Sequence, residues 1–444
     1  MVEETELRRR WLGDGDGPGI YRIRGGVPIS GEIEPRGNKN AALPMLAAAM
    51  LTPEAVEIAN VPGIRDVRAM LGLLEGLGAR VTPAGDHTWR IEAAGIEDPA
   101  PAASLAREIR ASFLLAGPLL ARTGRAVLPR PGGDRIGIRP LDPHIHALRE
   151  LGAEVEVLPD RYVMTAPRGL HGADLFLHEA SVMGTENAMM AAALATGRTV
   201  IRNAASEPHV QELAAMLAAM GAGIEGAGTN TVVVEGRPAL AGARVAVGPD
   251  HIEVGSLIGL AAATGGELLI RGARPRDHHR MTRIAFGRLG ITWEVRGDDI
   301  LVPAGQSLKV QEGLHGALPK IDDGPWPAFP ADLTSIAVVL ATQAEGTVLI
   351  HEKMFESRLF WIDGLIRMGA RIILCDPHRI VVTGPSRLYG ATLSSPDIRA
   401  GMALVIAALA AEGESVIHNI QQIERGYESL DERLRSLGAS IRRE

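Results

Sequence analysis

Residues 423–439 read IERGYESLDERLRSLGA, and this stretch shows the unit from which the chain is built. Its apolar residues follow one another at steps of 4, 3, 4 and 3: Ile423, Tyr427, Leu430, Leu434 and Leu437. Mostly charged residues lie between them, which is typical of a solvated helix with one apolar stripe. The stretch therefore predicts an amphipathic helix over residues 423–437, followed by Gly438 in the left-handed conformation that ends many helices.

The same ending, a helical stretch closed by glycine and followed by strand-like sequence, recurs along the chain. The glycines are spaced by 74, 69, 69, 79 and 69 residues: Gly78, Gly152, Gly221, Gly290, Gly369 and Gly438. Such regular spacing indicates six copies of one supersecondary unit, which fill the chain from about residue 28 to its end.

Each copy also contains an earlier helix that is apolar on nearly all sides and is therefore expected to be buried. These inner helices are expected at 41–51, 111–121, 187–196, 255–264, 333–342 and 401–411. With the strands around them, one copy has the order β-α-β-α-β-β. The pattern favours an α/β fold of two globular domains with three copies each, although an open solenoid has the same kind of repeat.

The composition of the 444 residues is that of a globular protein, with 46% hydrophobic and 22% charged residues. A net charge of −7 and few aromatic residues argue against a nucleic-acid partner. A single cysteine, Cys375, excludes a disulfide framework and is expected to be buried in a strand. We expect a flexible tail over residues 1–19, no membrane partner and a cytoplasmic location, and the oligomeric state stays open.

Cationic side chains gather at the starts of the predicted helices. Six of them lie at the starts of inner or outer helices: Lys39, Arg110, Arg139, Arg358, Arg399 and Arg425. A cation at a helix N-terminus is unfavourable unless an anion binds there, because the helix dipole is already positive. One explanation is solvated surface charge. The other is a cationic cleft for a small ligand that carries, for example, a phosphate and a carboxylate.

One loop stands outside the repeat. Residues 129–140 read PRPGGDRIGIRP, with three glycines, three prolines and Asp134 at the tip. This composition predicts an exposed, bent loop. It is either an ordinary surface loop or a mobile lid over an active site, with glycines as hinges.

Seven segments, in order along the chain, resemble one family of enzymes. They are residues 38–44 (NKNAALP), 139–144 (RPLDPH), 181–187 (SVMGTEN), 330–332 (PAD), 355–358 (FESR), 397–400 (DIRA) and 424–428 (ERGYE). From about residue 31 onward the chain is similar to the UDP-N-acetylglucosamine 1-carboxyvinyltransferases. The resemblance implies two inside-out α/β barrel domains, formed by residues 39–248 and by residues 20–38 with 249–444, and an active site between them.

The resemblance also implies the reaction. Members of this family transfer the enolpyruvyl group of phosphoenolpyruvate to the 3-hydroxyl of UDP-N-acetylglucosamine and release phosphate, the first committed step of peptidoglycan synthesis. Protonation of C3 makes C2 cationic, the sugar hydroxyl attacks C2, and loss of phosphate restores the double bond. This chemistry needs an acid, a base and cations around the phosphate and the carboxylate, but no metal and no other cofactor.

By resemblance, Asp134 is the acid, and Asp332 is the base that takes the proton of the sugar hydroxyl. A helix N-cap is the alternative role of Asp332. The implied phosphoenolpyruvate-binding residues are Lys39, Asn40, Arg139, Arg358, Arg399 and Arg425. The implied UDP-N-acetylglucosamine-binding residues are Arg110, Arg139, Pro140, Leu141, Asp142, Pro143, Ser181, Val182, Asp332 and Met354, and Asn40 borders this site as well. The adjacent His278 and His279 are expected on the surface and not as metal ligands.

The chief departure from the family pattern is Asp134, because most members carry cysteine at the loop tip. Aspartic acid can donate a proton, but it lacks the thiolate that fosfomycin alkylates, so the resemblance implies fosfomycin resistance. Pro143 stands where leucine is usual in the family, Leu114 stands where some members carry an aromatic residue, and both positions border the implied sugar site. These changes keep open the same chemistry on another nucleotide or nucleotide-sugar acceptor. A second alternative is a non-catalytic paralogue that binds a nucleotide sugar. Retention of Asp134 and Asp332 argues against the second.

Overall fold

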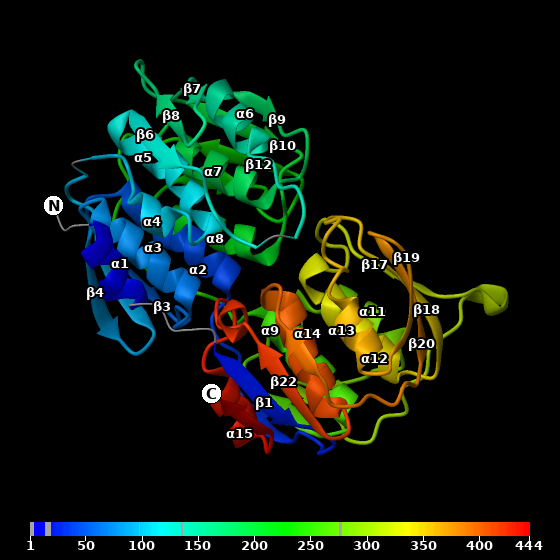
Figure 1. Cartoon of the computed structure of the whole chain (residues 1–444). Helices are drawn as coiled ribbons and strands as arrows, with labels where there is room; N and C mark the ends of the chain where they lie inside the picture. The colour runs from blue at the N-terminus through cyan, green and yellow to red at the C-terminus, as the bar shows by residue number, and fades with distance from the viewer. Residues whose placement is uncertain (1–3, 14–18, 97, 135, 275–277) are drawn as a thin grey trace. The chain divides into compact units, whose positions relative to one another are not determined.

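The computed structural model describes residues 4–13, 19–96, 98–134, 136–274 and 278–444 (Figure 1). The chain divides into two compact units. Unit 1 comprises Met1–Gly15, Gly37–Gly133 and Arg139–Gly248. Unit 2 comprises Asp16–Arg36, Asp134–Ile138 and Pro249–Glu444.

Three small sheets form the strand layer of unit 1, counted over the described residues. Their strand orders are β13 (Arg244–Ala246), β3 (Ala55–Ala59), β5 (Thr88–Glu92), β4 (Arg80–Gly85); then β6 (Arg125–Pro129), β8 (Arg161–Thr165), β7 (Glu154–Val157); then β11 (Gly223–Glu225), β12 (Thr231–Glu235), β10 (Arg198–Arg202), β9 (Asp174–Phe176). In each of the two four-stranded sheets, one edge strand pairs in parallel and the other pairs are antiparallel. The recurring pairing confirms that one supersecondary unit is repeated.

Unit 2 likewise has three sheets within the part of the chain that the structure describes. Their strand orders are β21 (Thr392–Ser394), β22 (Glu414–His418), β1 (Ile20–Arg24), β23 (Ser440–Arg443); then β15 (Glu294–Arg296), β16 (Asp299–Val302), β14 (Leu268–Ile270), β2 (Gly31–Ile33); then β17 (Lys320–Asp322), β18 (Gly346–His351), β20 (Arg379–Gly384), β19 (Arg371–Asp376). The N-terminal strand β1 lies antiparallel between β22 and β23. The first strand of the chain thus completes the last copy of the repeat, as the resemblance implies.

The six expected inner helices are present and buried. They are α2 with the 3-10 turn η1 (Lys39–Ala48, Ala49–Leu51), the 3-10 turn η2 with α5 (Arg110–Leu115, Ala116–Thr123), α7 (Val182–Ala193), α9 (His251–Thr264), α12 (Thr334–Gln343) and α14 (Ile398–Ala410). In unit 2, α9, α12 and α14 pack against one another (Figure 1). Their all-round apolar sequences are explained by this burial.

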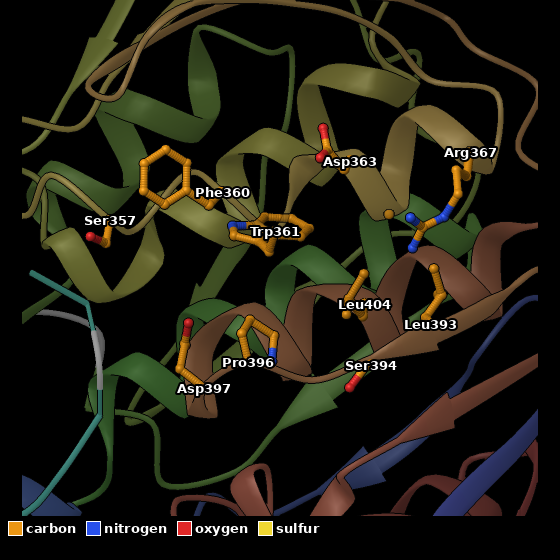
Figure 2. Close-up of a pocket in the computed structure, with 11 residues that line it drawn as sticks. Ser357, Phe360, Trp361, Asp363, Arg367, Leu393, Ser394, Pro396, Asp397 and Leu404 are labelled. Carbon is orange, nitrogen blue, oxygen red and sulfur yellow. The ribbon is translucent and has the colours of Figure 1, made fainter.

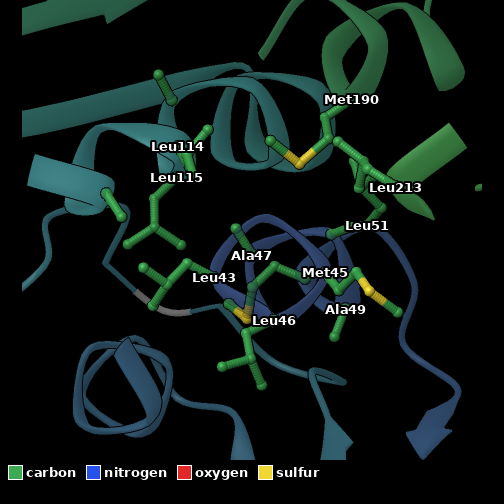
Figure 3. Packing of buried hydrophobic residues seen from close by; sticks show 14 of the residues in the cluster. Leu43, Met45, Leu46, Ala47, Ala49, Leu51, Leu114, Leu115, Met190 and Leu213 are labelled. Carbon is green, nitrogen blue, oxygen red and sulfur yellow. The ribbon is translucent and has the colours of Figure 1, made fainter. Parts of the chain in front are cut away.

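The core of unit 1 forms around α2. Figure 3 shows Leu43, Leu46 and their neighbours packed with Leu114 and Leu115 of η2 and with Met190 of α7. Leu114 is 1% exposed. Leu114 therefore belongs to the core and not to an exposed surface.

The outer helices are α3 (Arg65–Gly76), α6 (Asp142–Glu150), α8 (Pro208–Ala219), α11 (Arg280–Gly287), α13 (Ile362–Arg367) and α15 (Leu430–Ser436). The predicted helix over 423–437 is wrong in its first half. A 3-10 turn η5 (Ile420–Gln422) and further turns lead to Ser429, whose φ of 44° interrupts a right-handed helix. Ile423 and Tyr427 are nevertheless buried in the core of unit 2, although their backbone forms turns and not a helix.

The expected flexible tail is also wrong over residues 4–12, which form the helix α1 (Glu4–Leu12). Leu7 and Leu12 are buried, and α1 packs on α3 and on the short helix α4 (Ala103–Ala106) (Figure 1). Trp11 Nε1 donates a hydrogen bond to Glu75 Oε2 at 2.6 Å, and its ring centroid lies 5.6 Å from that of Trp89. The remaining tail residues 1–3 and 14–18 lie outside the described residues.

Two single-residue expectations need correction. Cys375 lies in a strand as predicted, but it is exposed, because β19 is the edge strand of its sheet. His279 was expected on the surface but is 2% exposed, and burial lowers its pKa to about 4. No described helix is long and apolar enough to cross a membrane.

Candidate active site

Asp332 of unit 2 lies between two arginines. It stands in the 3-10 turn η4 (Ala331–Leu333), which leads into α12. Arg358 Nη2 donates a hydrogen bond to Asp332 Oδ1 at 2.7 Å, and Arg399 Nε donates one to Oδ2 at 3.0 Å. Arg399 is in the first turn of α14, whose N-terminal N–H groups are capped by the carboxylate of Asp397. The starts of two inner helices thus bring Asp332 and Arg399 together, and Arg358 joins them from the segment before α13.

Close packing fixes the turn that carries Asp332. A Cβ atom at Gly255 of α9 would lie 2.7 Å from Leu333 Cδ1, closer than real Cβ contacts come. Glycine at this position therefore lets α9 approach η4 directly. Neither η4 nor α12 has a side-chain cap, so the alternative role of Asp332 as a helix cap is wrong.

The two guanidinium groups control the charge of Asp332. Arg358 and Arg399 are 4% and 6% exposed. Burial by itself would raise the pKa of Asp332, but the attraction of Arg399 and Arg358 outweighs it and holds this pKa well below its usual range. The carboxylate is therefore ionised, and it becomes a stronger base only when another anion takes up part of the positive charge.

Arg399 is held in turn by Tyr427. Arg399 Nη1 donates to the Tyr427 hydroxyl at 3.4 Å, and this hydroxyl lies 3.0 Å from Ser256 Oγ on α9. The Arg399 guanidinium also lies 5.8 Å from the centroid of the Tyr427 ring. Tyr427 lies in the segment 424–428 that resembles the family, but nothing in the sequence indicated its contact with Arg399.

Asp134 forms an ion pair with Arg425 inside unit 2. Arg425 Nη1 donates to Asp134 Oδ1 and also to Gln422 Oε1, the latter at 3.0 Å. The side chains of Asp134 and Arg425 are only 17% and 11% exposed. The acid implied by the resemblance thus contacts one of the cations implied to bind phosphoenolpyruvate.

The segment after Asp134 is held close to Arg358. Ile138 N donates to Glu356 Oε1 at 2.8 Å, and Ser357 N donates to Ile136 O at 3.1 Å. Between them, Gly137 has a φ of 142°, and a Cβ atom there would lie 2.5 Å from Glu356 Oε2. Glycine is therefore required at this point of the loop.

In unit 1, Lys39 forms a buried ion pair with Asp66. Lys39 is the first residue of α2, and the side chain of Asn38 caps this helix by accepting from Asn40 N at 2.8 Å. Lys39 Nζ lies 2.7 Å from Asp66 Oδ2 on α3, and both side chains are more than nine-tenths buried. Sequence analysis did not find Asp66, because an acidic residue in the first turn of an outer helix is unremarkable by itself.

Arg110 and Arg139 lie together in unit 1. Arg110 Nη2 donates to the backbone oxygens of Arg139 and Pro140, at 2.5 and 3.3 Å. Burial, and then repulsion by Arg139, lowers the pKa of Arg110 to about 10. Gly133 packs beside them, since a Cβ atom there would lie 2.9 Å from Arg110 Cβ. Two adjacent cations of this kind favour an anionic ligand such as a diphosphate.

The other residues implied for the nucleotide sugar divide between the units. Pro143, in the first turn of α6, approaches the start of α7, because a Cβ atom at Gly184 would lie 3.0 Å from both Pro143 Cβ and Ser181 Oγ. Ser181 caps α7 ahead of Val182. The remaining residues differ in exposure. Pro140 and Asp142 are exposed, Leu141 is buried, and Met354 of unit 2 is 38% exposed.

A cavity of about 460 Å³ in unit 2 lies beside this chemistry rather than on it. Its lining includes Ser357, which precedes Arg358 in the chain, and Asp397, which lies shortly before Arg399. It includes no residue that the sequence assigned to the site. Figure 2 shows Trp361 across the middle of the lining, with Ser357 and Asp397 towards one end and Arg367 at the other. The described residues include no group of three or more His, Cys, Asp or Glu side chains that could hold a metal ion.

Comparisons with known proteins agree with this architecture. The family model of EPSP synthase (3-phosphoshikimate 1-carboxyvinyltransferase) matches residues 23–434. The enolpyruvyl transferase NikO from Streptomyces tendae has a TM-score of 0.84 over 96% of this chain and 99% of that chain, at 25% identity. EPSP synthase from Acinetobacter baumannii has a TM-score of 0.73 at 18% identity, over 96% of this chain and 100% of its own, and shows the fold alone. The chain therefore belongs to the enolpyruvyl transferases, and the predicted two-domain inside-out α/β fold is confirmed.

Its curated relatives carry a narrower name. UDP-N-acetylglucosamine 1-carboxyvinyltransferase from Treponema denticola is 56% identical over 421 residues, which are 95% of this chain and 98% of that protein. The enzyme of the same name from Bradyrhizobium diazoefficiens is 56% identical over 423 residues, 95% of this chain and 97% of that protein. Within the family, the chain thus groups with the UDP-N-acetylglucosamine 1-carboxyvinyltransferases, as its motifs predict.

Proposed function

We propose that the protein transfers the enolpyruvyl group of phosphoenolpyruvate to the 3-hydroxyl of UDP-N-acetylglucosamine and releases phosphate. The observation that carries the proposal is the position of Asp332 between two buried arginines. A carboxylate and two cations in contact suit a reaction in which a hydroxyl loses its proton beside a phosphate and a carboxylate. The names of relatives that are 56% identical support the choice of acceptor.

Asp134 is the proposed acid. Its carboxyl group donates a proton to C3 of phosphoenolpyruvate and makes C2 cationic, and it takes the proton back when the double bond is restored. Arg425, which pairs with Asp134 in the structure, is also proposed to hold phosphoenolpyruvate. Substrate binding then exchanges the ion pair for contacts between Arg425 and the anionic groups of the substrate.

Asp332 is the proposed base. The oxygen of the 3-hydroxyl bonds to C2 while its proton passes to Asp332, and this proton leaves with the phosphate when the C2–O bond breaks. Arg358 and Arg399 are proposed to bind phosphoenolpyruvate together with Lys39, Asn40 and Arg139. When they share their charge with the substrate, their hold on the Asp332 carboxylate weakens, which strengthens it as a base.

The remaining assignments follow from the acceptor. We assign the diphosphate to Arg110 and Arg139, which lie together in unit 1. Pro140, Leu141, Asp142, Pro143, Ser181, Val182 and Met354 are proposed to complete the nucleotide-sugar site. The reaction places the protein in the cytoplasm at the start of peptidoglycan synthesis, with consequences for cell shape and division, and Asp134 at the loop tip supports fosfomycin resistance.

The test is phosphate release from phosphoenolpyruvate with a panel of acceptors. UDP-N-acetylglucosamine should give the highest kcat/KM, and the product should gain the mass of one enolpyruvyl group. Uridine monophosphate, UDP-glucose and UDP-N-acetylgalactosamine are the matched comparisons. A different preferred acceptor, or binding of the nucleotide sugar without any phosphate release, would contradict the proposal.

A further inference from the structure

Tyr427 is a buried tyrosine that contacts the candidate active site but has no role in the function proposed above. It is 2% exposed and lies in the turns between η5 and α15. Its hydroxyl lies 3.4 Å from Arg399 Nη1 and 3.0 Å from Ser256 Oγ. Buried polar groups are nearly always hydrogen-bonded, so the partners of this hydroxyl indicate what it does.

The hydrogen bonds around Tyr427 run in one direction. Ser256 Oγ donates its single proton to Ile252 O, one turn earlier in α9, at 2.9 Å. The Tyr427 hydroxyl therefore donates to Ser256 Oγ, and its own oxygen accepts from Arg399 Nη1. Three hydrogen bonds in sequence thus connect the guanidinium of Arg399 to the backbone of α9.

Two glycines allow the turns that carry this tyrosine to pack on α14. A Cβ atom at Gly426 would collide with Ile398 Cγ2, in the first residue of α14. A Cβ atom at Gly401 of α14 would lie 2.5 Å from Ile423 Cγ1. The backbone of the turns therefore approaches the first turn of α14 directly, and Arg399 stands in that turn.

The three nitrogens of the Arg399 guanidinium are divided between two partners. Nε and Nη2 lie 3.0 and 2.9 Å from Asp332 Oδ2, whereas Nη1 donates to the Tyr427 hydroxyl. The guanidinium carbon also lies 5.8 Å from the centroid of the Tyr427 ring, which favours a cation–π contact. Arg399 is therefore held by an anion on one edge and by a neutral aromatic side chain on the other.

The two partners of Arg399 respond differently when an anionic substrate binds. The hold of Arg399 on Asp332 weakens, because the substrate takes up part of the positive charge. Burial raises the pKa of Tyr427 above its ordinary value, although the attraction of Arg399 opposes this rise, so the hydroxyl is uncharged at neutral pH. A neutral partner does not compete with the substrate for charge, and its contact with Arg399 persists.

We propose that Tyr427 is a positioning residue for the enolpyruvyl transfer proposed above: its hydroxyl and ring hold the Arg399 guanidinium in place for phosphoenolpyruvate while Asp332 is released to act as the base. A carboxylate in its place would orient Arg399 but would neutralise the cation that has to bind an anion. The inference rests on the proposed function for the identity of that anion and for the role of Asp332.

The first experiment is Tyr427→Phe, which keeps the ring and removes the hydroxyl. KM for phosphoenolpyruvate should rise by about tenfold, because Arg399 Nη1 loses its acceptor and the guanidinium is no longer held for the substrate. KM for UDP-N-acetylglucosamine should stay unchanged, and kcat should change less than KM for phosphoenolpyruvate. Calorimetric binding of phosphoenolpyruvate alone gives the same comparison without turnover.

Tyr389→Phe is the matched control. The guanidinium of Arg387 lies 5.5 Å from the ring centroid of Tyr389, a contact of the same kind in the same unit, but Tyr389 is 49% exposed. This variant should leave both KM values unchanged. Thermal unfolding shows whether each variant is folded, and a merely structural role of Tyr427 would change the KM of both substrates alike.

Ser256→Ala tests the direction of the hydrogen bonds, because it removes the acceptor of the Tyr427 hydroxyl. By itself this substitution should raise KM for phosphoenolpyruvate, but by a smaller factor than Tyr427→Phe. In the Tyr427→Phe background it should add nothing, since Ser256 reaches Arg399 only through that hydroxyl.

Unchanged binding of phosphoenolpyruvate by Tyr427→Phe would overturn the inference, and so would equal losses of affinity for both substrates. Effects of Tyr427→Phe and Ser256→Ala that multiply in the double variant would overturn it as well. Failure of the proposed function has a different signature, namely binding of phosphoenolpyruvate without phosphate release by the unchanged protein. In that case calorimetry still decides whether Tyr427 positions Arg399, whereas absence of this binding would overturn both.

Discussion

Arg358 Nη2 lies 2.7 Å from Asp332 Oδ1, and this contact joins a proposed substrate-binding cation to the proposed base. The substitution Asp332→Asn keeps the shape of the side chain but removes its ability to accept a proton. We expect kcat to fall by about 10²–10⁴-fold, because loss of a general base acts on the barrier. Binding of phosphoenolpyruvate, measured by calorimetry, should be retained or strengthened, since the two arginines lose a competing anion.

Asp376→Asn is the matched control for this substitution, because Asp376 pairs with Arg379 on the surface of the same unit. It should leave kcat and both KM values unchanged. A joint loss of binding, turnover and folding in Asp332→Asn, with the control intact, would show that Asp332 is structural and not the base.

The lowered pKa of Asp332 also predicts how stability depends on pH. A carboxylate whose folded-state pKa lies below its unfolded value of about 3.9 stabilises the fold above that pH, and this contribution is lost as the pH falls through the folded-state pKa. The unfolding temperature of the unchanged protein should therefore exceed that of Asp332→Asn by a constant amount from pH 5 to 7. The gap should shrink below about pH 4. An equal gap at pH 3 and pH 7 would contradict the assignment of the lowered pKa to Asp332.

Sequence periodicity predicted correctly those elements whose position depends only on the burial of apolar side chains. Helices that are apolar on every side, such as residues 401–411 at α14, are stable only when they are buried in the core. All six predicted inner helices are present and buried. The helix expected at 423–437 was wrong in its first half, where residues 423–429 form turns that bury the same apolar side chains. Spacing reports which residues are buried, but it does not report which backbone conformation buries them.

The positions of charged residues in the sequence predicted less of the structure than the apolar periodicity did. The sequence predicted a flexible tail over residues 1–19, but Arg8 pairs with Glu108 and Arg10 with Glu75, which lie far away along the chain. Asp66 was missed for the same reason, since its partner Lys39 is brought to it only by the fold. The sequence thus indicated the cations of the site together with Asp134 and Asp332, whereas the ion pair between Lys39 and Asp66 is found only in the structure.

Asp66→Asn tests the buried pair with Lys39. The substitution leaves the Lys39 ammonium more than nine-tenths buried without its carboxylate, which typically costs about 3–5 kcal/mol. Urea unfolding should show a loss of this order, and the double variant Lys39→Met/Asp66→Asn should be more stable than Asp66→Asn alone. Stability of the double variant at or below that of the single one would mean that the pair contributes little.

Helix α1 should stabilise unit 1. Trp11→Ala removes the packing on Trp89 and the hydrogen bond to Glu75, and we expect a loss of about 1–3 kcal/mol in urea unfolding with little change in kcat. Glu6→Ala is the control on the exposed side of the same helix and should be neutral. Equal stability of Trp11→Ala and Glu6→Ala would contradict the packing of α1 on unit 1 and would support the flexible tail that the sequence predicted.

Asp134 predicts the response to fosfomycin. A carboxylate is a much weaker nucleophile towards an epoxide than a thiolate, so the unchanged protein should keep its activity and its mass after incubation with the drug. Because Cys375 is exposed, the comparison belongs in a Cys375→Ser background, which should otherwise behave like the unchanged protein. There, Asp134→Cys should retain activity, lose it with time in the drug and gain one adduct per chain, while Asp134→Ala should lose most turnover. A covalent adduct on the Cys375→Ser protein that still carries Asp134, or full activity of Asp134→Ala, would remove Asp134 from the proposed mechanism.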